Sequence, residues 1–302
     1  MTGLAVFAYS ETGHECLRFL FDRGESVSLV VTHPDAPGEN VWFPSVAELA
    51  RSRGLEPVVV EAPDATLTAR VRAAAPDLIF SFYFRHLLPE EILKLAPRGA
   101  YNLHGSLLPK YRGRAPVNWA LVHGETQTGA TLHVMSARAD AGEIVDQEPV
   151  PIGPDDSAFE VQKRVTKAGL RILERRLGEL RSGTAPRRAQ DEREATTFPR
   201  RSPEDGRIDW TRSAEEVHNL VRAVAHPYPG AFTDIFGGRT FVWKTRLPHL
   251  GAHDNFPGQV RAEQGRLYVA CGDDRYVEIL RIQREGQNEI DARHFLSEAV
   301  SS

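Results

Sequence analysis

The residues with the greatest capacity for chemistry lie near the middle of the chain. Asn102 and His104 are separated by a single leucine. In an extended strand this spacing puts both side chains on one face, about 7 Å apart. An asparagine amide can donate a hydrogen bond to a developing oxyanion, and a histidine can carry a proton near neutral pH. The pair therefore predicts a site for acyl transfer.

A carboxylate that could serve the histidine comes later in the chain. Asp140 lies in a short polar stretch that follows an apolar segment over residues 131–135. Beside His104, its negative charge would favour the imidazolium and make that ring a better proton donor. A structural interpretation stays open at this point. A histidine next to a glycine occurs in buried turns, and an aspartate before Ala-Gly is a frequent turn former.

The elements that must position these residues predict an α/β fold. Short apolar runs alternate with helical patterns in the first half of the chain, and this order requires parallel strands joined by crossover helices. We therefore expect a doubly wound, Rossmann-like parallel sheet that binds ligands at the carboxyl ends of its strands. The expected strands are residues 4–9, 26–32, 57–60, 78–82, 101–103 and 131–135, and the expected helices are residues 10–24, one from Ser45 and 64–75.

The second half of the chain predicts a different kind of domain. An amphipathic helix over 157–181 is followed by a polar, arginine-rich linker over 183–202. Ser213 and Glu216 have capping-box spacing, and short strands of period two come after that helix. We expect an N-terminal domain over 1–190 and a small OB-like β-barrel domain over 203–302.

Composition excludes several classes of function. The formal charge of −4 opposes binding to a phosphate backbone, so no nucleic-acid partner is expected. Cys16 and Cys271 are far apart and have no metal-site spacing, so no metal is expected. The start of the chain lacks a secretory pattern, and no apolar run is long enough to span a membrane. These observations favour a cytoplasmic protein.

The turn after the first strand could hold an anion on its backbone amides. Residues 7–13 lead from strand to helix but lack the three-glycine dinucleotide fingerprint, so a nicotinamide site is not expected. A plain helix start and a ligand-binding turn remain the two interpretations of this segment.

Two ordered motifs carry a resemblance to a known family. Residues 102–113 read Asn-Leu-His-Gly-Ser-Leu-Leu-Pro-Lys-Tyr-Arg-Gly, and residues 139–145 read Ala-Asp-Ala-Gly-Glu-Ile-Val. Both are similar to motifs of the folate-dependent formyltransferase superfamily. The resemblance runs from the first strand to about residue 273 and implies an N-formyltransferase.

The resemblance also implies residue roles and a co-substrate. His104 would carry the proton, Asn102 would steady the tetrahedral intermediate, and Asp140 would favour charged His104. The co-substrate would be N10-formyltetrahydrofolate, with no metal. It would lie against the loop residues His86, Leu87, Leu88, Arg114, Ser136, Ala137, Arg138, Ala139 and Asp140.

Within the superfamily the chain is most similar to the UDP-4-amino-4-deoxy-L-arabinose formyltransferases, which include one half of a bifunctional polymyxin resistance protein. The similar stretches include residues 7–9, 80–83 and 113–116. This implies a nucleotide-linked amino sugar as the acceptor, in lipid A or surface polysaccharide modification. Tyr9, Asn118 and Arg201 are the candidate sugar contacts. The chain is either a free-standing enzyme or a piece of a longer one.

Three alternative functions stay open. One is formylation of methionyl-tRNA, although residues 33–40 form a short acidic loop that is poorly suited to a polyanion. A second is formylation of a dTDP- or GDP-linked amino sugar. The third is a nucleotide-binding module without activity. The sequence leaves a homo-oligomer open.

Overall fold

The computed structural model describes residues 3–36, 38–250 and 254–295. The chain divides into two compact units, and each is built around its own β-sheet. The first unit comprises Met1–Pro116, Thr128–Val150 and Lys163–Pro199, and the second comprises Val117–Gln127, Pro151–Gln162 and Arg200–Ser302. The chain thus passes between the units more than once, and the domain boundaries expected from the sequence stay predictions.

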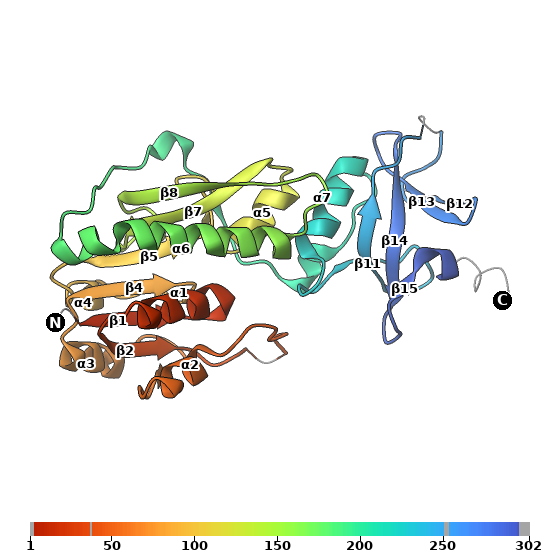
Figure 1. The fold of residues 1–302 in the computed structure, drawn as a ribbon. Helices are drawn as coiled ribbons and strands as arrows, with labels where there is room; N and C mark the ends of the chain where they lie inside the picture. The colour runs from red at the N-terminus through yellow and green to blue at the C-terminus, as the bar shows by residue number, and fades with distance from the viewer. Residues whose placement is uncertain (1–2, 37, 251–253, 296–302) are drawn as a thin grey trace. The chain divides into compact units, whose positions relative to one another are not determined.

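The first unit is centred on a mainly parallel sheet (Figure 1). From β3 to β5 neighbouring strands are parallel, while β5 and β7 are antiparallel. All five positions of β1 and of β4 are buried, as expected for strands covered on both faces. In sheet order the strands are β3 (Val58–Val59), β2 (Val27–Thr32), β1 (Leu4–Ala8), β4 (Leu78–Phe82), β5 (Ala100–His104), β7 (Gln127–Val134) and β8 (Ile144–Pro151).

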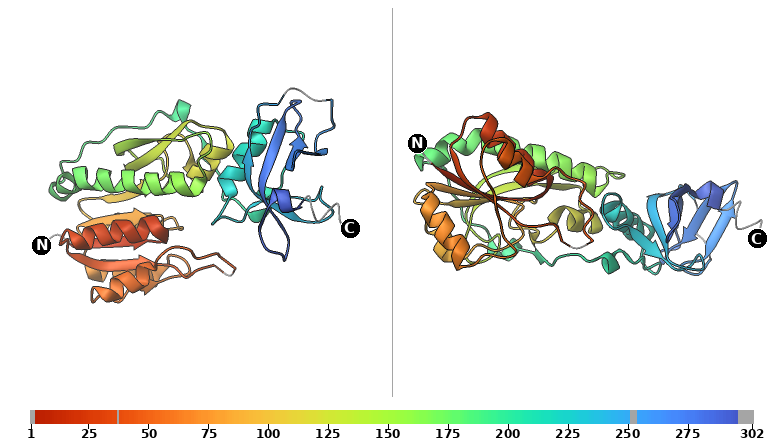
Figure 2. Two further views of the ribbon diagram at one scale, coloured as in Figure 1. Left: turned by 45° about the vertical axis from the view of Figure 1, so that its right-hand side comes forward. Right: turned by 90° about the horizontal axis from the view of Figure 1, so that it is seen from below.

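Helices cover both faces of this sheet. In the views of Figures 1 and 2, α1 and α6 lie on one face and α3 and α4 lie on the other. The hydroxyl groups of Thr12 and Thr166 are 2.7 Å apart, and this hydrogen bond joins α1 to α6. The helices are α1 (Ser10–Asp22), α2 (Val46–Ser52), α3 (Ala65–Ala74), α4 (Glu90–Leu93) and α6 (Ala158–Ser182).

Helix starts follow the capping signals in the sequence. The Ser45 hydroxyl accepts a hydrogen bond from the Glu48 amide at the start of α2. Ser213 and Glu216 form the predicted capping box at the start of α7 (Ala214–Val224). Gly13 in α1 has a packing role, because an added Cβ there would lie 2.9 Å from the Phe82 carbonyl oxygen.

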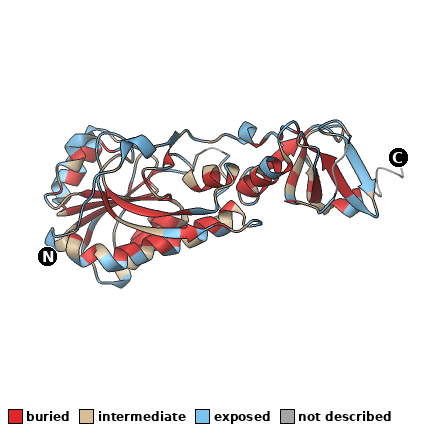
Figure 3. Ribbon diagram, turned by 90° about the horizontal axis from the view of Figure 1, so that it is seen from above, coloured by how far each residue is buried: buried red, intermediate tan, exposed pale blue. Residues whose placement is uncertain are grey.

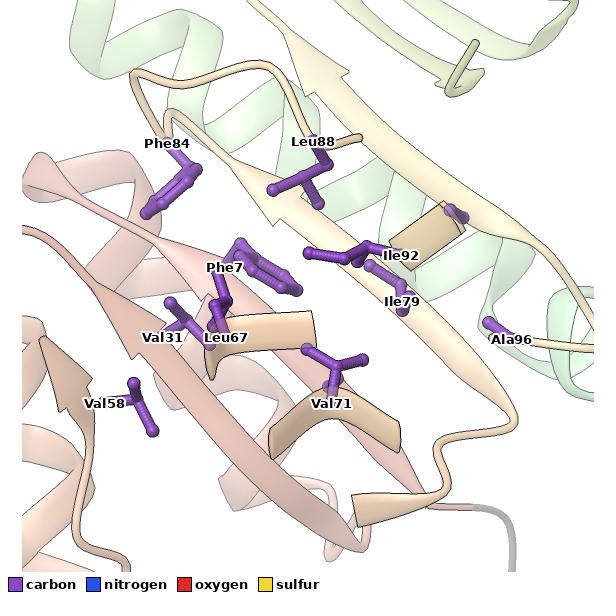
Figure 4. Packing of buried hydrophobic residues seen from close by; sticks show 12 residues of the cluster. Phe7, Val31, Val58, Leu67, Val71, Ile79, Phe84, Leu88, Ile92 and Ala96 are labelled. Carbon is purple, nitrogen blue, oxygen red and sulfur yellow. The ribbon is translucent and has the colours of Figure 1, made fainter. Parts of the chain in front are cut away.

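A hydrophobic cluster on the α3 and α4 face fixes the sheet against its helices (Figure 4). Phe7 and Ile79 from the strands meet Leu67 from α3 and Ile92 from α4, and all four are at most 1% exposed. Burial of each such side chain is worth about 1.5–3 kcal/mol. Figure 3 shows the same division, with buried strands and helices that are exposed on their outer sides.

The second unit carries an antiparallel sheet, and its helices include α5 (Pro116–Val122) and α7. Together with the first unit this confirms the predicted fold class, a doubly wound mainly parallel domain followed by a smaller antiparallel β domain. The sheet order is β10 (Ala231–Thr233), β11 (Thr240–Arg246), β14 (Tyr276–Arg284), β13 (Arg266–Ala270) and β12 (Val260–Glu263), with β15 (Ile290–Asp291) paired to β14.

The segment expected to be a linker has defined structure. Its residues Thr197–Phe198 form β9, which pairs in parallel with β6 (Arg112–Gly113) of the first unit. A two-residue strand carries no hydrophobic period, so pattern analysis could not detect it. Within the described residues, no helix is long and apolar enough to cross a membrane.

Candidate active site

The predicted reacting residues come from one strand and one loop of the first unit. Asn102 and His104 lie on β5, and Asp140 lies in the loop between β7 and β8. His104 is the last residue of β5, at the carboxyl edge of the sheet where ligands of such folds bind. The strands before it end at the same edge, because β4 and β5 are parallel.

The structure brings these three side chains together. One carboxylate oxygen of Asp140, Oδ1, lies 3.5 Å from His104 Nδ1 and 3.4 Å from Asn102 Nδ2. The other, Oδ2, accepts a hydrogen bond of 2.8 Å from the Gly113 amide. A single carboxylate therefore connects the amide, the imidazole and the backbone of the loop after β5.

The charge on Asp140 is stabilised by its neighbours. Burial raises the pKa of its carboxyl group, but positive charge on His104, the neighbouring His133 ring and the Gly113 N–H together outweigh it. The net effect holds the Asp140 pKa well below its usual range. The site therefore has a fixed negative charge at neutral pH.

The orientation of the His104 ring is set by the backbone. Its Nε2 lies 2.7 Å from the Tyr111 carbonyl oxygen, and a carbonyl can only accept, so Nε2 carries a hydrogen. Nδ1 faces Asp140 and is the nitrogen left for proton exchange. Tyr111 is itself held in place, since its ring stacks on Phe198 with centroids 5.1 Å apart.

A second histidine belongs to this cluster, and sequence reasoning missed it. His133 on β7 is the antiparallel partner of Asn102 and is 2% exposed. Its Nε2 lies 3.1 Å from Asn102 Nδ2 and 3.4 Å from Asp140 Oδ1. Only the pairing of β5 with β7 places it there, and neither periodicity nor a motif specified that register.

The loop that carries Asp140 is held by a distant segment. The Gln190 amide nitrogen donates 2.7 Å hydrogen bonds to the carbonyls of Asp140 and Gly142, and its oxygen accepts from buried Arg112. Arg112 also pairs with Glu192. Arg112, which belongs to the motif over residues 102–113, thus makes contacts inside the protein that help to hold Gln190. Gln190 is a further residue that the sequence analysis did not identify.

The residues predicted to contact the folate lie on two loops of the first unit. Leu87 is 65% exposed, whereas Leu88 is buried in the hydrophobic cluster. His86 has its pKa lowered by partial burial and by the charges of Arg114 and Arg85. Ser136, Ala137, Arg138 and Ala139 are exposed, and the Ser136 hydroxyl donates to the Arg138 carbonyl.

The three candidate sugar contacts are engaged within the protein. The Tyr9 hydroxyl donates to Asp35 at 2.6 Å. The Asn118 amide nitrogen donates to the Ala223 carbonyl at 2.7 Å, and the Arg201 guanidinium lies over the Trp119 ring. Tyr9 belongs to the first unit, and Asn118 and Arg201 belong to the second.

Among the residues that the structure describes, none forms a group of three or more His, Cys, Asp or Glu side chains placed to hold a metal ion.

Solved structures with the same fold include two sugar-modifying enzymes. WlaRD, a sugar 3N-formyl transferase crystallised in the presence of dTDP and 5-N-formyl-THF, has a TM-score of 0.73 at 18% identity, over 95% of this chain and 99% of that one. The N-formyltransferase of Helicobacter canadensis, in complex with folinic acid and dTDP-3-aminofucose, has a TM-score of 0.71 at 18% identity, over 94% and 100%.

A third structure is similar over part of a longer protein. HypX from Aquifex aeolicus matches all of this chain but 49% of its own length, with a TM-score of 0.65 at 19% identity. At such identities these likenesses establish the fold. Family assignment comes from the sequence itself, because residues 16–177 match the formyl transferase family and residues 200–299 match the formyl transferase C-terminal domain. With the site at Asn102, His104 and Asp140 in the matched region, the chain belongs to the formyl transferase family.

Proposed function

We propose that this enzyme transfers the formyl group of N10-formyltetrahydrofolate to the amine of a nucleotide-linked amino sugar, UDP-4-amino-4-deoxy-L-arabinose in particular. The observation that carries the proposal is the convergence of Asn102, His104 Nδ1 and ionised Asp140 on one point. It is supported by the ligands named for two similar structures, a formylated folate and a dTDP-linked amino sugar.

The reaction needs one proton to move between two nitrogens. The acceptor amine attacks the formyl carbon, a new C–N bond forms, and the carbonyl electron pair moves to oxygen. Collapse of this intermediate breaks the bond between the formyl carbon and N10. His104 Nδ1 takes the proton from the amine and returns it to N10, so the ring ends in its starting state.

Asp140 and Asn102 lower the energy of different species along this path. While His104 is an imidazolium, its Nδ1–H faces the Asp140 carboxylate, which stabilises the positive charge. The Asn102 amide lies beside both groups and donates to the oxyanion of the tetrahedral intermediate. A fixed donor of this kind contributes on the order of 3 kcal/mol to lowering the barrier.

The donor is placed against the loop after β4 and the loop that carries Asp140. Exposed Leu87 offers apolar surface to a flat ring system, and Arg114 supplies a positive charge suited to the carboxylates of a folate. His86 and the exposed residues Ser136 to Ala139 complete this proposed surface.

The acceptor is proposed from the sequence resemblance to enzymes of lipid A modification. Tyr9, Asn118 and Arg201 remain its proposed contacts. Tyr9 is buried, and burial together with the hydrogen bond to Asp35 raises the Tyr9 pKa far above its usual range and keeps the hydroxyl protonated.

A dTDP-linked amino sugar is the second candidate, favoured by the nucleotides named for the two similar structures. Measurement of kcat/KM for UDP-, dTDP- and GDP-linked 4-amino sugars with N10-formyltetrahydrofolate separates the candidates. We expect the UDP-linked 4-amino-4-deoxy-L-arabinose to give the highest value. A higher value for a dTDP-linked sugar would overturn the choice of acceptor without affecting the assignment of formyl transfer.

A further inference from the structure

His133 has a defined pattern of hydrogen bonding inside the site. Its Nδ1 lies 2.9 Å from the Val134 carbonyl oxygen. Because a carbonyl oxygen can only accept, Nδ1 carries the hydrogen, and Nε2 of the neutral ring is a bare acceptor. The backbone of β7 thus fixes the tautomer of this buried histidine.

This tautomer determines how the Asn102 amide is turned. The end of the amide that faces His133 meets two acceptors, His133 Nε2 at 3.1 Å and Asp140 Oδ1 at 3.4 Å. An amide oxygen in that position would face lone pairs on both neighbours, whereas the NH2 group can donate to both. The nitrogen end of Asn102 is therefore directed at His133 and Asp140.

The two hydrogens of that NH2 group are held unequally. The contact to His133 Nε2 is the shorter one, and it comes from the strand directly opposite in the sheet. The contact to Asp140 is long for a hydrogen bond. The Asn102 hydrogen that faces Asp140 points toward the side where Asp140 meets His104. In the proposed reaction, the reacting atoms lie on that side.

We propose that His133 is a positioning residue, which anchors one N–H of Asn102 so that the other is aimed at the oxyanion. The proposal rests on the proposed function, because it assigns His133 to the same formyl transfer. A donor fixed before the reaction costs no reorganisation when charge develops. Without the anchor the amide can rotate about its last side-chain bond, and the donor is in place for a fraction of the time.

Kinetics of His133→Leu, His133→Gln and a control variant test this role. We expect His133→Leu to lower kcat about tenfold with little change in KM, because the loss falls on the transition state. His133→Gln restores most of kcat, since its side-chain oxygen can accept from Asn102. Thr128→Val is the control, because Thr128 is buried on the same strand and its hydroxyl lacks a hydrogen-bond partner in the structure. It should leave kcat unchanged.

The same substitution made in an Asn102→Ala enzyme distinguishes a positioning role of His133 from a general contribution to the fold. In an enzyme that already carries Asn102→Ala, the further change His133→Leu should have no effect on kcat, because the group that it positions is gone. An equal fall in both backgrounds, or a kcat within twofold of wild type for His133→Leu alone, would overturn the proposal.

Nitrogen NMR of the imidazole tests the same inference without any activity. The folded wild-type protein, labelled with 15N-histidine and assigned through His133→Gln, should show neutral His133 with its hydrogen on Nδ1. A hydrogen on Nε2 would contradict the anchor even if formyl transfer is confirmed. A protein that transfers no formyl group but shows the Nδ1–H form would reject the proposed function alone.

Discussion

At the scale of single residues, the site depends on one carbonyl oxygen. Tyr111 accepts the Nε2 hydrogen of His104, and this leaves Nδ1 pointing at Asp140. The same ring with its hydrogens reversed would offer no basic nitrogen to a substrate amine. Backbone geometry in the loop after β5 therefore fixes the His104 tautomer that the proposed proton transfer requires.

Removal of either reacting side chain tests these roles. His104→Ala and Asn102→Ala should each lower kcat by about 100-fold or more, because proton transfer and oxyanion stabilisation each contribute on this order. Steady-state kinetics and thermal unfolding of both variants provide the measurement. A near-normal kcat in either variant would show that the roles are wrongly assigned.

A second prediction at the scale of single residues concerns the contribution of Glu39 to the free energy of unfolding. Burial raises the pKa of Glu39, but two hydrogen bonds from Arg85, the Ala36 N–H and the Tyr9 hydroxyl outweigh it and lower the pKa to about 2. Since the folded pKa lies below the unfolded value near ~4.3, the stabilisation is present above that value. It is lost as pH falls toward about 2.

Glu39→Gln should therefore lower the free energy of unfolding at pH 7 by on the order of 2 kcal/mol and flatten its decline in acid. Urea unfolding between neutral pH and pH 3 measures both effects. Glu56→Gln is the matched control, because its ion pair with Arg51 is exposed and contributes little. Parallel pH profiles for wild type and Glu39→Gln would reject this account.

The cluster of candidate site residues could be predicted from the sequence in part. Period two places Asn102 and His104 on one face of a strand, and this was sufficient to expect a shared ligand. His133 could not be found in that way, because its place depends on which residue of β7 lies opposite Asn102. Strand register is set by packing of the whole sheet, and a short apolar run does not encode it.

At the scale of elements, the Asp140 loop is the part that most needs support. Gln190 joins this loop to the segment before β9 through the carbonyls of Asp140 and Gly142. Asp140 also has a positive φ of 53°, a backbone conformation that neighbouring structure must maintain. The segment expected to be a linker thus helps to hold the loop of the proposed site.

Loss of Gln190 should weaken catalysis more than stability. Gln190→Ala removes both donors to the loop, and we expect kcat to fall about tenfold while the Tm changes by a few degrees. Gln283→Ala, which removes an acceptor of the Trp243 indole in the second unit, is the control and should leave kcat unchanged. An unaltered kcat for Gln190→Ala would show that the loop holds its shape unaided.

Two glycine-to-alanine substitutions should change the stability of the protein in opposite directions. An added Cβ at Gly142 would lie 1.8 Å from the Val134 carbonyl oxygen, so Gly142→Ala should destabilise the protein by about 2 kcal/mol or more. Gly178 lies within α6 with open space around it, so Gly178→Ala should stabilise by about 0.5–1 kcal/mol. Thermal unfolding of the two variants should shift the Tm in opposite directions, and shifts of the same sign would contradict the packing described.

Elements with strong local signals were predicted, and one edge strand was not. Capping residues marked the starts of α2 and α7, and continuous apolar runs marked β1 and β4. The strand β8 reads Ile-Val-Asp-Gln-Glu-Pro-Val-Pro, and its acids and prolines resemble a loop. It forms at the edge of the sheet, where proline is tolerated, and Asp146 and Glu148 pair with arginines of α6.

At the scale of the whole molecule, the candidate residues are divided between the two units. The first carries the proposed reacting residues and the surface proposed for the folate. The second carries Asn118 and Arg201, which remain proposed contacts of the acceptor. The fold class followed from sequence patterns, because each pattern is local to one unit. Sequence patterns could not predict that the chain passes repeatedly between the units, because that feature depends on long-range contacts.

The most direct test is the mass of the product. The protein is incubated with N10-formyltetrahydrofolate and UDP-4-amino-4-deoxy-L-arabinose, and the sugar nucleotide is analysed by mass spectrometry. The account predicts a gain of one formyl group on the sugar amine with wild type and almost none with His104→Ala. Absence of formylated product from the panel of UDP-, dTDP- and GDP-linked amino sugars, or equal formation with His104→Ala, would contradict it.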